Sequence, residues 1–224
     1  MSPTLAIRQA VLPGISATAG GGADARREQR AAQRESGHAL LRRCADELWP
    51  AQSPAIVRDG ERWRIDPHAH PHACAAVAHS GRHIIAAVAS RGRIGVDVED
   101  ESRRPPALED ARGFVDASSL DRLLLLPEDQ RAHAFIRLWT AFEAFGKAIQ
   151  RDLLPSIQTP LFGDDGRLSP AAFHNRGLAL YAYNSSNMAY AIVADTTLPV
   201  REVAPYFRRV HDWTGLVAGR NGGA

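Results

Sequence analysis

The chain has 224 residues, of which 45% are hydrophobic and 23% are charged. This balance excludes wholesale disorder and supports a hydrophobic core in one large domain or two small ones. The 27 basic and 25 acidic residues leave a formal net charge of +2, which is too small to favour a nucleic-acid-binding protein.

The first half of the chain predicts a loop, a long helix and two strands. Residues 14–25 are small and rich in glycine, which is typical of a mobile loop. Apolar residues at helical spacing predict a helix from about Ala23 to Leu48. After an irregular, proline-containing stretch at 66–72, the apolar runs at 83–89 and 93–99 have the composition of strands.

The second half adds a helix and a hairpin. Residues 103–106, Arg-Arg-Pro-Pro, have the composition of a linker. Pro127 marks the start of a helix at about 128–150. The runs 178–183 and 188–194 flank Asn-Ser-Ser-Asn, which predicts a hairpin. Mixed strands and helices in both parts predict an α+β fold with an N-terminal half at 1–104 and a C-terminal half at 105–224.

Two carboxylates share one face of the second predicted strand. Ile94, Val96 and Val98 alternate with Asp97 and Glu99, so the two acidic side chains point to the same side. Their Cβ atoms are about 6–7 Å apart, close enough to share a hard divalent cation through oxygen ligands. The alternative is an ordinary solvent-facing strand edge.

A second constellation lies on the predicted helix at 128–150. Trp139, Glu143 and Lys147 recur at intervals of four residues and therefore form one stripe. Glu143 and Lys147 are either a surface ion pair of small energy, or a third carboxylate for the cation and a phosphate contact. Lys147 is the only lysine among 27 basic residues, so generic surface charge in this chain is carried by arginine. This usage favours a functional role for Lys147.

Two further groups are candidates for anion binding. His79 and Ser80 precede the first strand, where they either bind an anion or cap a turn. Arg27, Arg30 and Arg34 share one face of the long N-terminal helix and form either a solvated surface or an anion-binding stripe.

In their order and spacing, these pieces resemble the 4′-phosphopantetheinyl transferases of the Sfp type. The family motifs read approximately S-H-S, G-[IV]-D-[IV]-E and W-x-x-K-E-[AS]-x-x-K. The corresponding segments here are Ala-His-Ser at 78–80, Gly-Val-Asp-Val-Glu at 95–99 and Trp-Thr-Ala-Phe-Glu-Ala-Phe-Gly-Lys at 139–147. The resemblance spans about residues 74–148, with looser similarity in the terminal hairpin.

The resemblance implies two similar α/β halves that form a pseudo-dimer within one chain, with the active site between them. It implies transfer of the phosphopantetheine arm of coenzyme A to a serine of an acyl, peptidyl or aryl carrier protein. This reaction depends on Mg²⁺ and releases 3′,5′-ADP. A pseudo-dimer already contains the interface that a smaller homologue would form by association, so we expect a monomer.

Residue by residue, the resemblance assigns the site as follows. Asp97, Glu99 and Glu143 would hold Mg²⁺, and Glu143 would also accept the proton of the carrier serine. Lys147 would contact the phosphate and assist catalysis. His79 and Ser80 would bind the nucleotide end of the coenzyme, with Arg30 and Arg34 as further basic contacts.

Two positions depart from the family motifs. Phe142 stands where the family usually has the first lysine of its third motif, and Ala78 replaces the first serine of S-H-S. We expect the Phe142 ring either to be buried between the halves or to face the pantetheine arm. On that view Phe142→Lys would transfer the arm at least as fast as the wild type, while unfolding a few degrees earlier. The loss of the lysine also leaves open a degenerate relative that binds coenzyme A or a carrier protein without catalysis.

A zinc-binding module is a further alternative. Its ligands would come from the following residues: His68, His70, His72, Cys74 and His79. Two prolines interrupt this stretch, and no zinc-ligand spacing such as C-x-x-C supports it.

The expected subcellular location depends on three kinds of sequence signal: cysteine patterns, membrane-spanning segments and secretion signals. Cys44 and Cys74 cannot form a disulfide framework, which is typical of a reducing compartment. No apolar run is long enough to cross a membrane, and no secretion signal is visible. We therefore expect a cytoplasmic protein that binds neither membranes nor nucleic acids.

Overall fold

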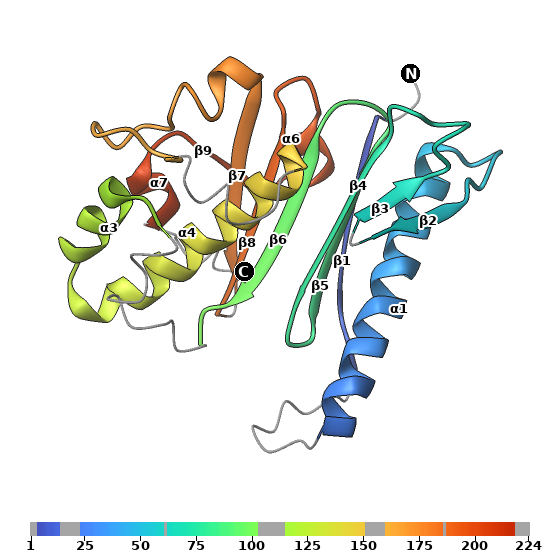
Figure 1. Cartoon of the computed structure of the whole chain (residues 1–224), viewed down its shortest axis with the longest axis horizontal. Coiled ribbons are helices and arrows are strands. Elements are labelled where there is room, and N and C mark those ends of the chain that lie inside the picture. Colours follow the sequence, from blue (N-terminus) through green and yellow to red (C-terminus); the bar gives the residue numbers. More distant parts are fainter. Residues whose placement is uncertain are drawn as a thin grey trace.

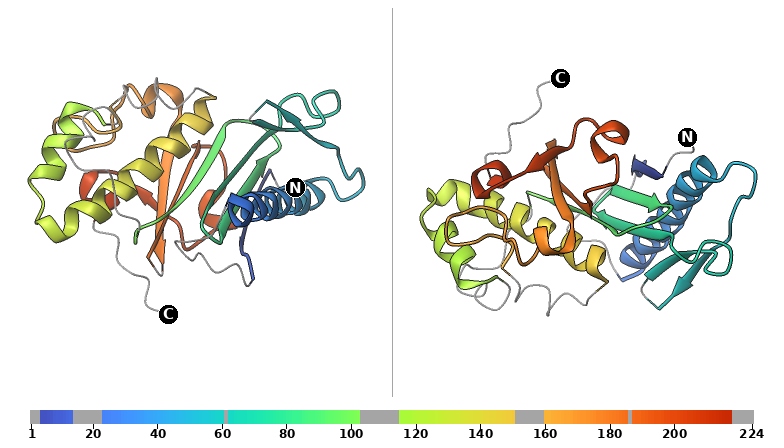
Figure 2. Two further views of the ribbon diagram at one scale, coloured as in Figure 1. Left: turned by 60° about the horizontal axis from the view of Figure 1, so that its bottom comes forward. Right: turned by 90° about the horizontal axis from the view of Figure 1, so that it is seen from above.

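The computed structural model describes residues 4–13, 23–60, 62–102, 115–150, 160–185 and 187–217. Within these residues, two antiparallel β-sheets pack against each other, and one long helix covers the outer side of each sheet (Figure 1). Figure 2 shows the two long helices on opposite sides of the molecule. The protein therefore has a mixed α/β architecture.

The first sheet is built from the N-terminal part of the chain. Its strands are β1 (Leu5–Val11), β4 (Cys74–Ser80) and β5 (His83–Ala89), in the order β1-β5-β4. The helix α1 (Ala23–Leu48) covers it, with Leu40, Leu41 and Cys44 buried against the sheet. A small hairpin of β2 (Ile56–Asp59) and β3 (Arg62–Ile65) lies beside this sheet.

The second sheet combines one strand from the middle of the chain with three from its C-terminal part. The strands are β6 (Ile94–Asp100), β7 (Leu178–Ser185), β8 (Met188–Asp195) and β9 (Arg208–Val210), in the order β6-β8-β7-β9. The helix α4 (Glu128–Ile149) covers its outer face. The remaining elements are α3 (Ala117–Leu124), η1 (His174–Arg176), α6 (Val200–Val203) and α7 (Trp213–Val217).

Strand β6 has one apolar face, which packs in the core between the two sheets, and one polar face, which is directed to α4. Ile94, Val96 and Val98 are at most 3% exposed and enter the core that is shared by the two sheets. The alternate residues point to the other side, toward α4. The alternation seen in the sequence therefore places Asp97 and Glu99 on the side of the helix.

Most predicted elements are confirmed with small shifts in their ends. The long N-terminal helix, the strand at 83–89, the helix ending at Ile149 and the terminal hairpin are all present. His79 and Ser80, which were expected to precede the first strand of this region as a turn or an anion-binding loop, instead form the end of the strand β4. The glycine-rich residues 14–22 and the linker at 103–106, which includes the boundary between the predicted halves, lie outside the described residues. No helix in the described ranges has the length and apolar content needed to span a membrane.

Candidate functional site

Gly95 brings β6 into direct contact with the end of α4. A Cβ atom at this position would lie 2.0 Å from the Ala144 carbonyl oxygen and 2.4 Å from the Ala148 amide nitrogen. Real Cβ atoms do not approach backbone atoms this closely, so only glycine permits this spacing of strand and helix. The close approach sets the acidic face of β6 against the stripe of α4 that carries Glu143 and Lys147.

Asp97 and Lys147 form an ion pair at this contact. The Lys147 Nζ lies 2.7 Å from Asp97 Oδ1, and the Asp97 side chain is only 6% exposed. Burial raises the pKa of Asp97 to about 7, against the lowering effect of Lys147, and the nearby Glu143 and Glu99 charges raise it further. The second oxygen of Asp97, Oδ2, is buried and makes no hydrogen bond with a described residue. One carboxylate oxygen is thus available to a further positive group.

Glu143 completes the charged cluster on α4. Its Oε2 lies 3.7 Å from Lys147 Nζ, and its side chain is 24% exposed. Burial opposes the charged form of Lys147, but Asp97 and Glu143 together raise its pKa above the usual value. Lys147 therefore remains a cation in this site. Trp139, the first member of the predicted stripe, packs against the core and stacks on Phe135 with ring centroids 6.4 Å apart.

Ser80 supports the second carboxylate of β6. Its hydroxyl donates a hydrogen bond to Glu99 Oε2 at 2.8 Å and accepts one from the Asp100 amide at 3.2 Å. Ser80 is only 2% exposed. Ser80 was expected to contact the coenzyme, whereas in the structure its hydroxyl joins β4 of the first sheet to Glu99 on β6 of the second.

The three predicted metal ligands lie on facing elements, although they do not surround a common point. In the described ranges, no three His, Cys, Asp or Glu side chains are placed to hold a metal ion. Lys147 contacts Asp97 and approaches Glu143, and Ser80 holds Glu99. Within the described residues, the histidines and Cys74 of the stretch 68–79 form no such group either.

A cavity of about 850 Å³ opens beside this cluster, and both parts of the chain line it. Its lining includes α1, the β2–β3 hairpin, β4 and the last turn of α4. Its charged side chains are Arg34, Arg58, Arg62, Arg64, Lys147 and Glu143. Because cations outnumber the single carboxylate among these lining residues, the cavity favours a ligand with several negative charges.

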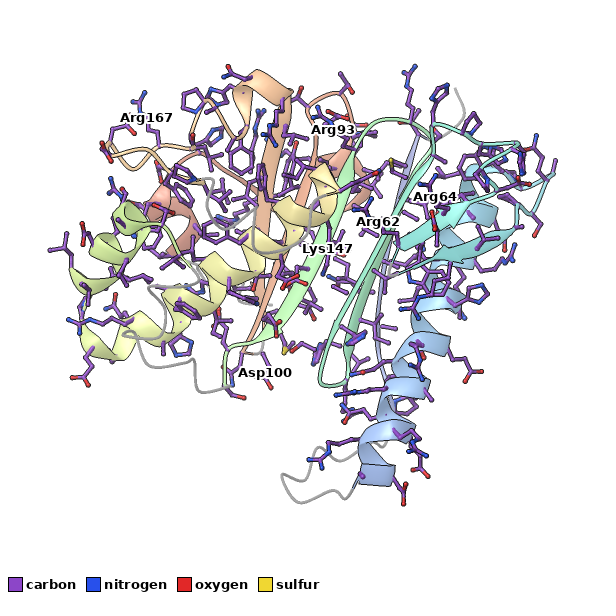
Figure 3. The ribbon with its side chains drawn as sticks, in the orientation of Figure 1. Arg62, Arg64, Arg93, Asp100, Lys147 and Arg167 are labelled. Atoms are coloured by element: carbon purple, nitrogen blue, oxygen red, sulfur yellow. The ribbon has the colours of Figure 1, made fainter. Side chains whose placement is uncertain are left out.

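The hairpin arginines were not identified from the sequence. Figure 3 shows Arg62 and Arg64 on the hairpin side of the cavity and Lys147 on the opposite side. Arg62 Nη2 donates to the Gln150 carbonyl oxygen at 2.5 Å, so it spans from the hairpin to the end of α4. The alternation Arg-Trp-Arg at 62–64 was the available signal, because it places two arginines on one face of a short strand.

The other predicted coenzyme contacts divide between two places. Arg34 and His79 line the cavity of about 850 Å³. Arg30 instead lines a separate groove of about 300 Å³ on α1, together with Arg26 and Arg27. Arg34 borders both, so the arginine stripe of α1 leads to the edge of the main cavity.

Phe142 lies away from the cavity. It is fully buried in the core between α4 and the second sheet. The ring is buried, as one of the two alternatives expected, but the buried residues of its core all come from 115–217. It therefore lies neither between the predicted halves nor toward the cavity, because position 142 is on the sheet-packing face of the helix. The neighbouring Glu143, one residue further around the helix, is directed to the cavity.

Two comparisons find similarity to 4′-phosphopantetheinyl transferases, and the family match includes the charged cluster. Residues 93–193 match the profile of the 4′-phosphopantetheinyl transferase superfamily. A 72-residue segment is 38% identical to the Synechocystis sp. protein named "Putative 4'-phosphopantetheinyl transferase slr0495". That segment covers 32% of this chain and 29% of the relative. The superfamily match contains Asp97, Glu99, Glu143 and Lys147, whereas His79, Ser80 and the cavity arginines precede it.

Proposed function

We propose that this protein is a 4′-phosphopantetheinyl transferase of the Sfp type. It would transfer the phosphopantetheine arm from coenzyme A to a serine hydroxyl of an acyl, peptidyl or aryl carrier protein and release 3′,5′-ADP. One observation carries this proposal. The Asp97–Lys147–Glu143 cluster lies within the superfamily match and borders a large cavity lined by arginines.

The cavity has the charge that coenzyme A requires. The coenzyme carries a pyrophosphate and a 3′-phosphate, and guanidinium groups bind phosphate oxygens through paired, charge-assisted hydrogen bonds. Arg34, Arg62 and Arg64 approach the cavity from two different elements. Lys147 stands on the opposite wall, where it would contact the pyrophosphate.

The donor chemistry of this cluster suits a Mg²⁺ ion, although its three carboxylates do not surround a common point within the described residues. Asp97, Glu99 and Glu143 supply the carboxylate oxygens that Mg²⁺ prefers, and the buried Asp97 Oδ2 lacks a described hydrogen-bond partner. We assign these three side chains as the ones that would hold the ion. When bound, Mg²⁺ would neutralise negative charge on the pyrophosphate during phosphoryl transfer.

Lys147 and Glu143 would have different roles in the transfer reaction. Lys147 keeps its proton, because Asp97 and Glu143 favour its charged form, and it would stabilise charge on the transferred phosphoryl group. Glu143 is partly exposed at the cavity, where its carboxylate would accept the proton of the attacking carrier serine. Gly95 holds the helix that carries both groups against β6.

The arrangement of layers supports the assignment to the Sfp type. Each sheet is covered by one long helix, and the cavity receives residues from both parts of the chain. We expect this pattern in a pseudo-dimer within one chain. Such a protein would act as a monomer, and we propose separately that it is cytoplasmic.

A non-catalytic relative is the second candidate function. Phe142 favours it, since the family's usual lysine is replaced here by a ring that is buried in the core. Such a protein would bind coenzyme A in the basic cavity without modifying a carrier.

Incubation with coenzyme A, Mg²⁺ and a panel of apo carrier proteins tests the proposal. Mass spectrometry should show the addition of one phosphopantetheine arm to at least one carrier. The Asp97→Asn variant should lose this activity, because it removes a charge that the metal needs. Binding of coenzyme A by calorimetry without modification of any carrier would instead support the non-catalytic relative, and absence of both would overturn the proposal.

A further inference from the structure

Strand β6 and helix α4 contact each other at two points, one before and one after the proposed metal ligands of the strand. At one end, Gly95 touches the backbone of Ala144 and Ala148. At the other end, Glu101 binds two side chains of the first half of α4. Asp97 and Glu99 lie between these points, at alternate positions of the same strand.

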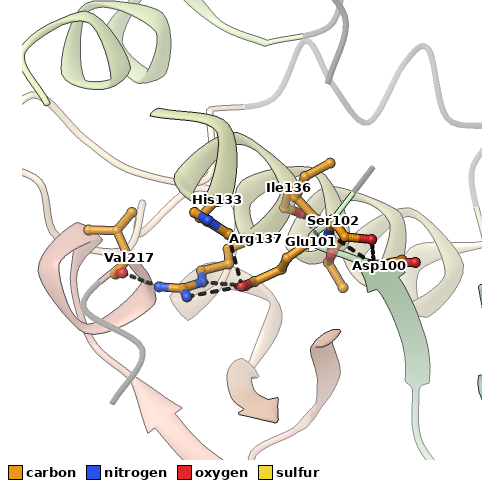
Figure 4. Close-up of polar contacts among 8 residues, drawn as sticks. Asp100, Glu101, Ser102, His133, Ile136, Arg137 and Val217 are labelled. Atoms are coloured by element: carbon orange, nitrogen blue, oxygen red, sulfur yellow. Dashed lines mark hydrogen bonds and ion pairs between the residues drawn. The ribbon is translucent and has the colours of Figure 1, made fainter. Parts of the chain in front are cut away.

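The contact at Glu101 is a network around one guanidinium group (Figure 4). Arg137 Nε donates to Glu101 Oε1 at 2.5 Å, and Arg137 Nη2 donates to Glu101 Oε2 at 3.2 Å. Arg137 Nη1 also donates to the carbonyl oxygen of Val217 at the end of α7. His133 Nδ1 lies 3.2 Å from Glu101 Oε2. Arg137 therefore joins the end of β6 to α4 and α7.

Burial gives this network a defined geometry. The Glu101 side chain is 6% exposed and that of Arg137 is 12% exposed. A buried carboxylate without its partner strongly destabilises the folded protein. Arrangements in which Glu101 and Arg137 are separated are therefore much higher in free energy than the paired one. A forked guanidinium also restricts orientation more than a single contact does.

We propose that Glu101 and Arg137 are positioning residues, which set the register of β6 against α4 so that Asp97 and Glu99 face Glu143. The inference rests on the proposed function, because it assigns the network a role in metal binding. Neither residue lines the cavity, so both act through the backbone of the two elements rather than on the ligand. A purely structural ion pair would affect stability alone.

Binding of Mn²⁺ measures this role directly. Electron paramagnetic resonance can follow free Mn²⁺ during titration of the full chain, with and without coenzyme A. Loss of a group that orients metal ligands lowers metal affinity by about 10-fold or more. For Glu101→Gln, which preserves shape but removes the charge, we expect Mn²⁺ affinity about 3- to 10-fold weaker. We also expect a lower kcat, with little change in KM for coenzyme A.

Asp195→Asn is the matched control. Asp195 pairs with Arg93 at 2.5 Å and is also partly buried, but this pair joins the residue before β6 to the end of β8. Within the described residues, the side-chain hydrogen bonds of the pair join the two residues to each other and to the Arg176 carbonyl oxygen, outside α4. The control should lower thermal stability while leaving Mn²⁺ affinity unchanged. Arg137→Lys, which keeps the charge but not the fork, should weaken Mn²⁺ binding in the same direction and serves if Glu101→Gln does not fold.

The outcomes separate the inference from the proposed function. If the wild type binds Mn²⁺ and modifies a carrier, but Glu101→Gln or Arg137→Lys behaves like Asp195→Asn, the positioning role is overturned and the proposed function stands. If the wild type neither binds Mn²⁺ nor modifies any carrier, both are overturned. Weaker Mn²⁺ binding in the Glu101 or Arg137 variant only, at equal or smaller loss of stability than the control, supports the inference.

Discussion

The buried carboxyl of Asp97 governs one pH response that we expect of this protein. Burial raises its pKa to about 7 in the folded state, whereas an unfolded chain has the ordinary, much lower value. Between these values the folded protein binds more protons than the unfolded one, so the free energy of unfolding falls as pH rises. The carboxyl thus favours the folded state in acid and less so near neutral pH.

Asp97→Asn should remove this dependence. Between pH 4 and pH 7, the wild type should lose stability relative to the variant by up to about 4 kcal/mol, since each pKa unit corresponds to about 1.4 kcal/mol. Urea denaturation at several pH values, with EDTA present, measures the difference. The exposed Asp164→Asn variant is the control and should run parallel to the wild type. Parallel curves for Asp97→Asn and wild type would contradict the raised pKa.

Phe142→Lys should unfold the core rather than improve phosphate binding. The ring is fully buried between α4 and the second sheet, so a lysine there would place an ammonium group in an apolar core. We expect a loss of at least about 3 kcal/mol, and a lower melting temperature by about 6–12 °C for a chain of this size. Differential scanning calorimetry measures this.

Phe142→Leu provides the comparison for that prediction. It keeps an apolar side chain and should cost less than half as much stability, with activity retained. A stable Phe142→Lys variant that transfers the arm faster than the wild type would show that position 142 reaches the ligand after all.

At the scale of elements, the close contact between β6 and α4 depends on a glycine, Gly95, which has no side chain. Gly95 sits directly beneath the backbone of Ala144 and Ala148, and Lys147 extends from the same turn to Asp97. The strand and helix therefore meet where the charged cluster forms. Glu101 and Arg137 make the corresponding contact at the other end of the strand.

Gly95→Ala should separate the two elements. The added methyl group would overlap backbone atoms, which cannot rotate away as a side chain can, so we expect a loss of about 1–3 kcal/mol or more. Transfer activity should fall at least tenfold even at temperatures where the variant is folded, because Asp97 and Glu143 move apart. Gly215→Ala in α7, where a Cβ would meet only Asp212 at 3.4 Å, is the control. Full activity of Gly95→Ala would contradict the role of this contact.

At the scale of the whole molecule, the cavity exists because segments far apart in the chain meet. The β2–β3 hairpin and α1 form one wall, and the end of α4 forms another. Arg62 spans between them through its bond to the Gln150 carbonyl oxygen. A ligand with several phosphates would therefore be held from both parts of the chain at once.

Removal of the hairpin charges should weaken coenzyme binding. For the double variant Arg62→Ala, Arg64→Ala, we expect KM for coenzyme A to rise about 10-fold or more, because each charge-assisted hydrogen bond contributes about 1.5–3 kcal/mol. The kcat at saturating coenzyme should change much less. Arg167→Ala, which lies on the far side of the molecule in Figure 3, should leave both parameters unchanged. An unaffected KM in the double variant would place the coenzyme elsewhere.

Much of the fold and part of the candidate site were accessible from local sequence patterns. Alternation along 94–99 placed Asp97 and Glu99 on the face opposite the apolar core, and the interval of four residues placed Glu143 and Lys147 on one stripe. Strand and helix periodicity depend on neighbouring residues only, which is why these features survive in the folded chain. The long helices and the terminal hairpin were predicted for the same reason.

Tertiary structure alone decided which of these patterns meet. Only the packed sheets direct the Ser80 hydroxyl to Glu99 and bring Arg62 and Arg64 to the cavity. Periodicity can indicate which face of an element a residue occupies, but it does not show which other element that face meets, because these contacts join residues separated by many positions in the chain and depend on how the sheets pack. The sequence by itself determined the charged groups and the faces that carry them. The distances between those faces, and hence the site, came from the packing of β6, α4 and the hairpin against one another.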